Sequence, residues 1–250
     1  MSTTSLADAA VLLSAWEEAA AVPDGAVAAT LLHRAGLVAS VDEGLDLPLG
    51  HAAARLARLY ADSFGNAVDA VLTCPGCQEH LEVSLPLAPL CRAPDGPDQQ
   101  IVSEETVPGK AGPPRDYVVR SPTGRDLLLA ATEPDPAAVL LSRCVVADDG
   151  AAVDPATLDA GSLEALDAAA ERLAGGAAPV LRSQCPACSE AVLADVDLAA
   201  LLWQRVCREA PVVLADVAEL SAAFGWSEAE VLAMSRTRRE AYLSLARGAT

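Results

Sequence analysis

Lysine is nearly absent from this chain of 250 residues, in which the 17 basic side chains are Lys110 and sixteen arginines. Acidic side chains number 35, so the formal net charge is −18. The excess is negative throughout: residues 1–73 hold 3 basic and 9 acidic side chains, residues 74–188 hold 8 and 17, and residues 189–250 hold 6 and 9. Nucleic acids and anionic membranes both bind clustered cationic side chains. We therefore expect neither as a partner, and the acidity favours solubility or a basic protein partner.

Long hydrophobic runs are also missing. A helix that crosses a bilayer needs about 20 apolar residues, and no stretch of this chain provides them. The first 25 residues have no basic segment before their apolar stretch, and acidic residues interrupt that stretch, so we expect no signal peptide. We expect a cytoplasmic protein, in which disulfides are rare. The seven cysteines then indicate metal binding, redox chemistry or simple burial.

Motifs of the common enzyme classes are missing as well. The sequence contains no phosphate-binding G-x-x-x-x-G-K-[ST], no G-x-G-x-x-G, no G-x-S-x-G and no H-E-x-x-H. No pair of carboxylates stands out from the acidic background. We therefore expect that the protein is not an enzyme and has no small-molecule substrate.

Two near-copies of one tetrapeptide are present, "CPGC" at 74–77 and "CPAC" at 185–188. A Cys-x-x-Cys turn offers two thiolates from one side, and a second turn supplies the other two ligands of a tetrahedral zinc site. The candidate ligands are Cys74, Cys77, Cys185 and Cys188. A four-cysteine site is closed to water, so the sequence predicts one structural zinc ion that ties together the ends of a 107-residue insertion.

Two other interpretations of the cysteines remain open. Each pair could be a thioredoxin-like redox motif, although both run into alternating strands rather than into a helix. The four thiols could also be ordinary buried residues. His80 could be a further ligand or a hydrogen-bond donor to the site, or an ordinary surface residue. Gln78 and Ser189 stand where such turns often have glycine, which implies strain if the backbone there is left-handed.

Helical periodicity dominates the rest of the chain, so we expect a mainly α fold with small β elements, stapled by a split zinc ribbon made of the two turns. "GLDLPLG" is expected to be a turn, and Pro211 is expected to start a new helix. The expected regions are an N-terminal helical region (1–70), a first zinc knuckle (71–91), a flexible excursion (92–116), an α/β insertion (117–176), a second zinc knuckle (177–197) and a C-terminal helical region (198–250).

The C-terminal helices, 197–247, are the predicted docking site for a partner protein. They have more apolar faces than one core can bury, and large aromatic and arginine side chains are typical interface anchors. The alternative is that Trp226 only staples its own helix against Val231 and that the arginines are solvated. The candidate partner-binding residues are Trp203, Trp226, Arg236, Arg238, Arg239 and Tyr242.

Four stretches carry a resemblance to a known family. They are the "AWE" of the first helix, the "LDLPLG" turn followed by "HAAARLARLYADSFG", the twin "CPGC" and "CPAC" with "RSPTGRDLL" between them, and the closing "LLWQ…ADVAELSAAFGWSEAEVLAMSRTRREAYL". On these stretches the chain resembles the baseplate hub assembly chaperone family of contractile-tail phages and phage-tail-like contractile injection systems. The match runs through most of the chain and leaves 92–115 unmatched. His51 and Asp216 stand where the family usually has Arg and His.

The resemblance implies a non-enzymatic assembly factor or component of such a baseplate, with baseplate or hub proteins as its partners. The alternative is a thiol-redox or zinc-dependent regulatory protein that uses the two Cys-x-x-Cys pairs. Tightly held zinc would favour the assembly factor, whereas free thiols of low pKa would favour the regulator.

Overall fold

The computed structural model describes residues 5–103, 116–175 and 177–248, and it is mainly helical with three small sheets, as predicted. The helices are α1 (Ala9–Ala20), α2 (Asp24–Arg34), α3 (Val41–Asp46), α4 (Leu49–Phe64), α5 (Gly124–Ala130), α6 (Pro136–Cys144), α7 (Ala160–Leu173), α8 (Leu198–Phe224), α9 (Glu228–Leu232) and α10 (Arg236–Gly248), with a short 3-10 turn at Pro155–Thr157. The strands are β1 (Ala67–Thr73), β2 (His80–Pro86), β3 (Gln99–Ser103), β4 (Asp116–Arg120), β5 (Val145–Ala147), β6 (Val180–Gln184) and β7 (Ala191–Asp195).

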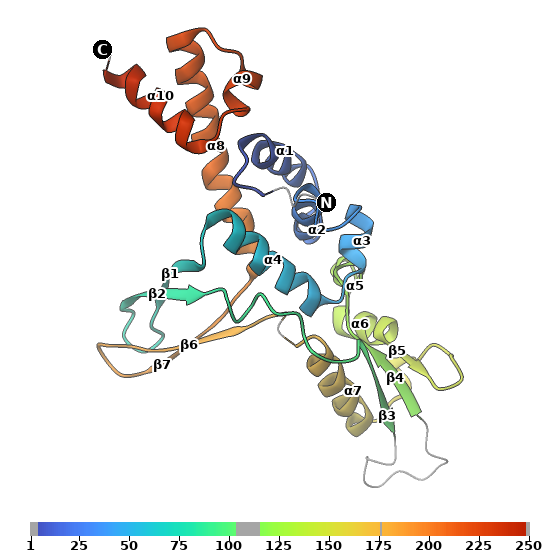
Figure 1. Ribbon diagram of the computed structural model, residues 1–250. Helices are drawn as coiled ribbons and strands as arrows, with labels where there is room; N and C mark the ends of the chain where they lie inside the picture. Colours follow the sequence, from blue (N-terminus) through green and yellow to red (C-terminus); the bar gives the residue numbers. More distant parts are fainter. Residues whose placement is uncertain (1–4, 104–115, 176, 249–250) are drawn as a thin grey trace.

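A central helical body is built from α1, α2, α4 and the first half of α8 (Figure 1). On α4 the buried residues recur at helical spacing, as Ala53, Leu56, Ala57 and Tyr60 show. On α8, Leu202 and Val206 are fully buried in the same core. Part of the predicted "GLDLPLG" turn is helical, because α3 continues to Asp46. This body is the platform from which the other parts of the molecule project.

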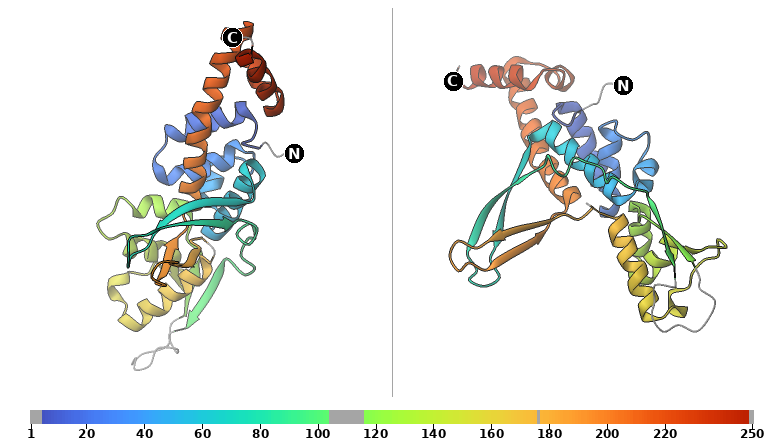
Figure 2. Two further views of the ribbon diagram at one scale, coloured as in Figure 1. Left: turned by 90° about the vertical axis from the view of Figure 1, so that its left-hand side faces the viewer. Right: turned by 60° about the horizontal axis from the view of Figure 1, so that its bottom comes forward.

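Two β-hairpins form an arm that extends from this body (Figures 1 and 2). Strand β1 pairs antiparallel with β2, and β6 pairs antiparallel with β7. The first hairpin begins at Ala67, four residues before the predicted range 71–91. Each hairpin therefore has a strand before its cysteines as well as after them, and the cysteines lie in the turn.

An α/β lobe is inserted between the two hairpins. Its sheet has the order β3-β4-β5, and α6 and α7 cover one face through a core that includes Tyr117, Val119 and Leu166. The expectation that 92–116 is an excursion without structure is corrected in part, because Gln99–Ser103 pairs with β4 as an edge strand. Residues 104–115 lie outside the described residues. The lobe therefore begins before the predicted boundary at 117.

The segment "RSPTGRDLL" joins the lobe to the helical body. Leu49 N–H donates to the carbonyl of Pro122 at 2.9 Å, which links α4 to this segment. The guanidinium of Arg125 on α5 forms ion pairs with Asp42 and Asp46 on α3. The segment "RSPTGRDLL" thus connects the inserted lobe to α3 and α4 of the helical part.

Helix α8 passes through Pro211 without interruption, so the prediction of a new helix at this proline was wrong. Proline inside a helix removes one backbone hydrogen bond and costs about 3 kcal/mol. Burial on both sides offsets this cost, because Ala210 and Val213 pack with Leu12 and Leu13 of α1. Long α8 therefore connects the helical body to the C-terminal bundle, which consists of the end of α8 with α9 and α10.

Candidate metal centre

The two Cys-Pro-x-Cys motifs form hairpin turns of the same backbone geometry. Cys74 N–H donates to the carbonyl of Glu79 at 2.9 Å, and Gln78 N–H donates to the carbonyl of Cys74 at 3.0 Å. The second turn repeats both bonds at 2.9 Å with every residue 111 positions later, so that Cys185 takes the place of Cys74. The internal repeat seen in the sequence is therefore a repeat of structure.

Left-handed backbone closes each turn directly after its second cysteine. Gln78 has φ 63° and Ser189 has φ 62°, and they are the only non-glycine residues with positive φ among those that the structure describes. A side chain in this conformation costs roughly 1–2 kcal/mol. The strain expected at these two positions from the missing glycines is thus present, and it appears twice at the same site.

The four predicted cysteines come together between the hairpins. Cys74 Sγ lies 3.6 Å from Cys188 Sγ, Cys77 Sγ lies 3.5 Å from Cys185 Sγ, and all four sulfurs are within 4.8 Å of one another. A tetrahedron with metal–sulfur bonds of about 2.3 Å has edges of about 3.8 Å, whereas a disulfide would need sulfurs about 2.05 Å apart. The first cysteine of each turn lies beside the second cysteine of the other, as a local two-fold relation would require.

A small apolar cluster packs around the two buried cysteines of the group. Cys74 and Cys185 are buried, whereas the second cysteine of each turn is exposed. Leu81 and Val192 occupy equivalent positions on β2 and β7 and are buried with them. Neighbouring side chains thus hold the two turns against each other, and the group could hold one metal ion.

The sulfurs compete for negative charge in this arrangement. The N–H groups of Cys188 and Ala187 donate to Cys185 Sγ and lower the pKa of that thiol to about 7, although burial opposes them. The N–H of Glu190 lowers the pKa of Cys188, but the contact with Cys77 and burial outweigh it and raise this pKa to about 12. A second thiolate beside the first is unfavourable unless a cation lies between them, and a divalent metal ion would remove this conflict.

The other sulfur and imidazole candidates lie outside the group. His80 is exposed at the start of β2, and its Nδ1 lies 3.4 Å from Thr73 Oγ1. Within the described part of the chain, the cluster consists of cysteines alone. Cys144 is buried, while Cys91 and Cys207 are half-buried.

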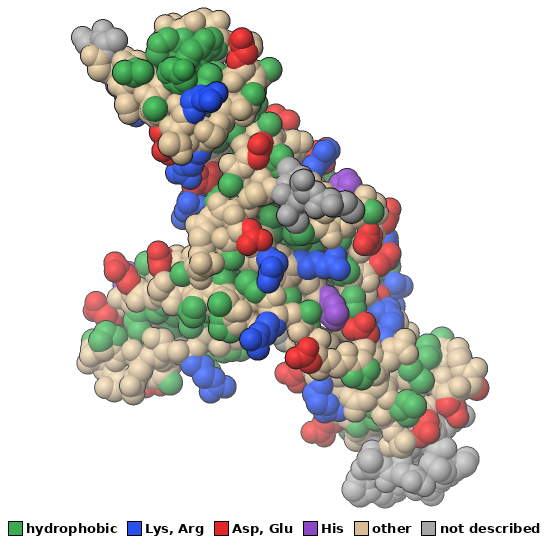
Figure 3. All heavy atoms as spheres, in the orientation of Figure 1, with side chains coloured by type: hydrophobic (Ala, Val, Ile, Leu, Met, Phe, Trp, Pro, Cys, Tyr) green, Lys and Arg blue, Asp and Glu red, His purple; other side chains and the backbone are tan. Residues whose placement is uncertain are grey.

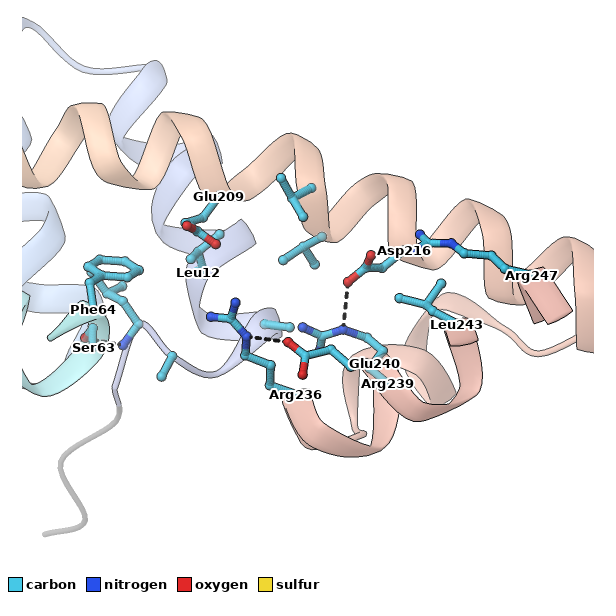
Figure 4. Close-up of a pocket in the computed structure, with 15 residues that line it drawn as sticks. Leu12, Ser63, Phe64, Glu209, Asp216, Arg236, Arg239, Glu240, Leu243 and Arg247 are labelled. Atoms are coloured by element: carbon cyan, nitrogen blue, oxygen red, sulfur yellow. Dashed lines mark hydrogen bonds and ion pairs between the residues drawn. The ribbon is translucent and has the colours of Figure 1, made fainter. Parts of the chain in front are cut away.

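Two of the predicted partner-binding arginines, Arg236 and Arg239, line a cavity of about 250 Å³ between α1, the end of α4, α8 and α10 (Figure 4). Arg239 is only 5% exposed and donates to Asp216 on α8, so it holds the bundle together and is not free to contact a partner. Arg236 pairs with Glu240 on its own helix. Arg238 is exposed. Arg239 is therefore not part of the predicted docking surface, because it is buried.

The predicted aromatic anchors separate into two places. Trp203 packs against the core of the helical body. Trp226 stacks on Phe224 with 4.6 Å between ring centroids and meets Tyr242 edge-on at 4.7 Å. This aromatic cluster sits in the C-terminal bundle, where hydrophobic side chains gather at the surface (Figure 3). Ser227 and Glu230 form a capping box, and Trp226 packs against the bundle core that contains Val231, as the stapling alternative expects.

A buried carboxylate in the inserted lobe was not identified from the sequence. Asp126 is 1% exposed and accepts hydrogen bonds from Arg120 at 2.6 and 2.9 Å and from Arg143 at 2.8 Å. Burial raises the pKa of this carboxyl, but Arg120, Thr123 and Arg143 outweigh it, so the pKa lies well below its usual range. The Thr-x-x-Asp spacing of a helix cap was the available signal, because Thr123 and Asp126 form a capping box.

None of the helices described in the three ranges is both long and apolar enough to cross a membrane. Comparison of the chain with protein-family models, with curated proteins and with solved structures finds no match in any of the three.

Proposed function

We propose that Cys74, Cys77, Cys185 and Cys188 bind one structural zinc ion and form a split zinc ribbon. The single observation that supports this best is the cluster of four sulfurs within 4.8 Å, supplied by two turns of matching geometry. Thiolate sulfur is the ligand that structural zinc prefers, and four ligands leave no open position for water. Reduced cysteines fit the cytoplasmic location that we also propose.

The geometry favours this site over the thiol-redox alternative. Redox Cys-x-x-Cys pairs sit where a strand meets the start of a helix, whereas both pairs here sit in hairpin turns. Cys77 Sγ lies 3.5 Å from Cys185 Sγ on the other hairpin, and Cys74 Sγ lies 3.6 Å from Cys188 Sγ. Two separate redox pairs would not need this arrangement, whereas one shared metal ion does.

The protein as a whole is proposed to act without catalysis, as an assembly factor or component of a contractile injection system or phage-like baseplate. Support comes from the resemblance along most of the chain, from the lack of enzyme motifs, and from a body that presents several projecting parts to partners (Figure 2). Its partners would be baseplate or hub proteins.

Two measurements on the full chain test the proposal separately. Elemental analysis of purified protein should find one zinc ion per chain, and a chelator should lower the melting temperature. Metal-free protein with unchanged stability would contradict the zinc ribbon. Co-purification with the sheath, tube and baseplate proteins of a contractile injection system tests the assembly role, which fails if none of them binds at micromolar concentration.

A further inference from the structure

Two depressions lie on either side of Leu127, and together they make one apolar groove. The first, of about 490 Å³, lies between the helical body and α5, and the second, of about 240 Å³, lies between α5, α6 and α7. Leu127 lines both of them and is 43% exposed, so it forms the ridge between them. We call this surface the Leu127 groove.

Small side chains form most of the floor of the first depression. Gly25, Ala28 and Ala29 come from α2, and Ala52 and Ala53 come from α4. Short side chains let the backbone of a bound segment approach closely, while leucines supply apolar contact. The second depression continues this character with Leu140 and Leu141 of α6. The shape and chemistry suit a row of large apolar side chains.

The charges around the groove all have one sign. The first depression includes the carboxylates of Asp24 and Asp197, and the second includes those of Asp167 and Glu171. All four residues are exposed. Among the described residues, no lysine or arginine lines either depression, and none of the four carboxylates forms an ion pair. Other carboxylates of this chain do find arginine partners. These four keep their negative charge for external cations, and Asp197 also caps α8 by accepting a hydrogen bond from the Ala200 N–H at 2.9 Å.

We propose that the Leu127 groove binds a basic amphipathic helix of a partner protein. Apolar residues on one face of that helix enter the two depressions, and Lys or Arg residues beside this face pair with the four carboxylates. Helices bind apolar grooves in this way through side chains at positions i, i+3, i+4 and i+7. Charge complementarity selects a protein segment over a neutral apolar molecule, and it disfavours a second copy of this acidic chain. The inference rests on the proposed role in protein–protein binding, but it does not depend on zinc.

Fluorescence anisotropy with a labelled peptide tests this proposal on the full chain. The probe is a peptide of about 18 residues made only of Leu and Lys, with the leucines on one helical face. A peptide of the same composition with leucines distributed around the helix controls for charge, and a Leu/Glu peptide of the first pattern controls for apolar binding. The patterned Leu/Lys peptide should bind at least tenfold more tightly than either control.

Matched variants locate the binding site. Leu127→Gln should weaken the patterned peptide at least tenfold, whereas Leu129→Gln on the same helix should change its affinity less than twofold. Asp167→Asn with Glu171→Gln should weaken binding about fivefold, as expected for two exposed ion pairs. Asp69→Asn with Glu82→Gln removes the same charge from the exposed hairpin arm and should leave the affinity within a factor of two. Circular dichroism of each variant establishes that it is folded.

Several outcomes would overturn the proposal. Equal binding to all variants would show general attraction to an acidic protein, and equal binding of the Leu/Glu peptide would remove the charge argument. A concentration-dependent dimer that Leu127→Gln abolishes would make the occupant a second copy. If no peptide binds while a baseplate protein still co-purifies, the groove is wrong and the assembly role stands. If the patterned peptide binds as predicted and no baseplate protein does, the groove stands and the assembly role is wrong.

Discussion

The Sγ atoms of Cys77 and Cys185 lie 3.5 Å apart, although the two residues are 108 positions apart in the chain. The two hairpins that carry them flank the inserted lobe in the sequence, so any bond between their turns closes a long loop of chain. Closing such a loop restricts the unfolded chain, and a metal that binds only the folded arrangement adds its binding energy to folding. The proposed metal centre would thus act as a staple that joins the two hairpins at the turns of their arm (Figure 1).

Replacing Cys74 by Ser should abolish zinc binding and lower the melting temperature, because the site loses a buried ligand. Cys91→Ser is the matched control, since Cys91 is half-buried and lies outside the cluster. It should keep the zinc and most of the stability. Plasma mass spectrometry and thermal unfolding of both variants check this. Full zinc content in Cys74→Ser would show that the metal is held elsewhere.

Glycine at either left-handed position should stabilise the protein. Gln78→Gly and Ser189→Gly remove a side chain from backbone with φ 63° and 62°, which relieves roughly 1 kcal/mol each. Gln184→Gly, in strand β6, should instead destabilise by about 0.5–1 kcal/mol, because its backbone is extended. Urea unfolding of the three variants measures the difference. Destabilisation by Gln78→Gly and Ser189→Gly alike would mean that their side chains contribute contacts worth more than the strain.

The two cysteine turns and the helical content could be predicted because their signals are local. A Cys-x-x-Cys turn sets its own geometry through nearby backbone hydrogen bonds, and an apolar stripe marks a helix whatever it packs against. The edge strand at Gln99–Ser103 could not be predicted in this way, because its ladder partner β4 follows a stretch rich in proline and glycine. Nor could the burial of Arg239, which depends on Asp216 of another helix.

At Pro211 a local sequence signal was present, but it predicted the wrong structure. The local signal for a helix start was strong, yet α1 packs on both sides of the proline and keeps α8 continuous. Tertiary burial here exceeds the cost of one missing hydrogen bond. Local sequence rules therefore failed at Pro211 because contacts with a distant segment decided the outcome.

Asp126→Asn should destabilise the inserted lobe by about 3 kcal/mol, because it leaves two arginines without their common carboxylate. This loss of stability is at the low end of the usual range, because both guanidinium groups are about one-third exposed and solvent screens them in part. The folded-state pKa of Asp126 is lowered, so its stabilisation is present above the unfolded pKa of about 4 and is lost as the pH falls below it. Wild-type stability should therefore decrease below about pH 4 more steeply than that of the Asn variant, as urea unfolding at several pH values would reveal.

Phe224 offers a way to separate docking from stapling in the C-terminal bundle. It is 40% exposed and stacks on Trp226, whereas Leu220 is fully buried in the bundle core. If the aromatic cluster anchors a partner, Phe224→Ala should weaken binding to baseplate components at least tenfold while lowering stability by less than about 1 kcal/mol. Leu220→Ala should instead lower the free energy of unfolding by about 2–5 kcal/mol, because it removes a fully buried side chain.

Truncation after Gly225 gives an independent check of the same surface. It removes α9 and α10, but the helical body keeps its own core of α1, α2, α4 and the first half of α8, so zinc content and most helicity should remain. Because the cut exposes Leu220, the truncated chain should also carry Leu220→Gln to stay soluble. Such a chain should no longer co-purify with baseplate components. If it still does, or if Phe224→Ala binds them normally, then the bundle only completes the fold and docking takes place elsewhere.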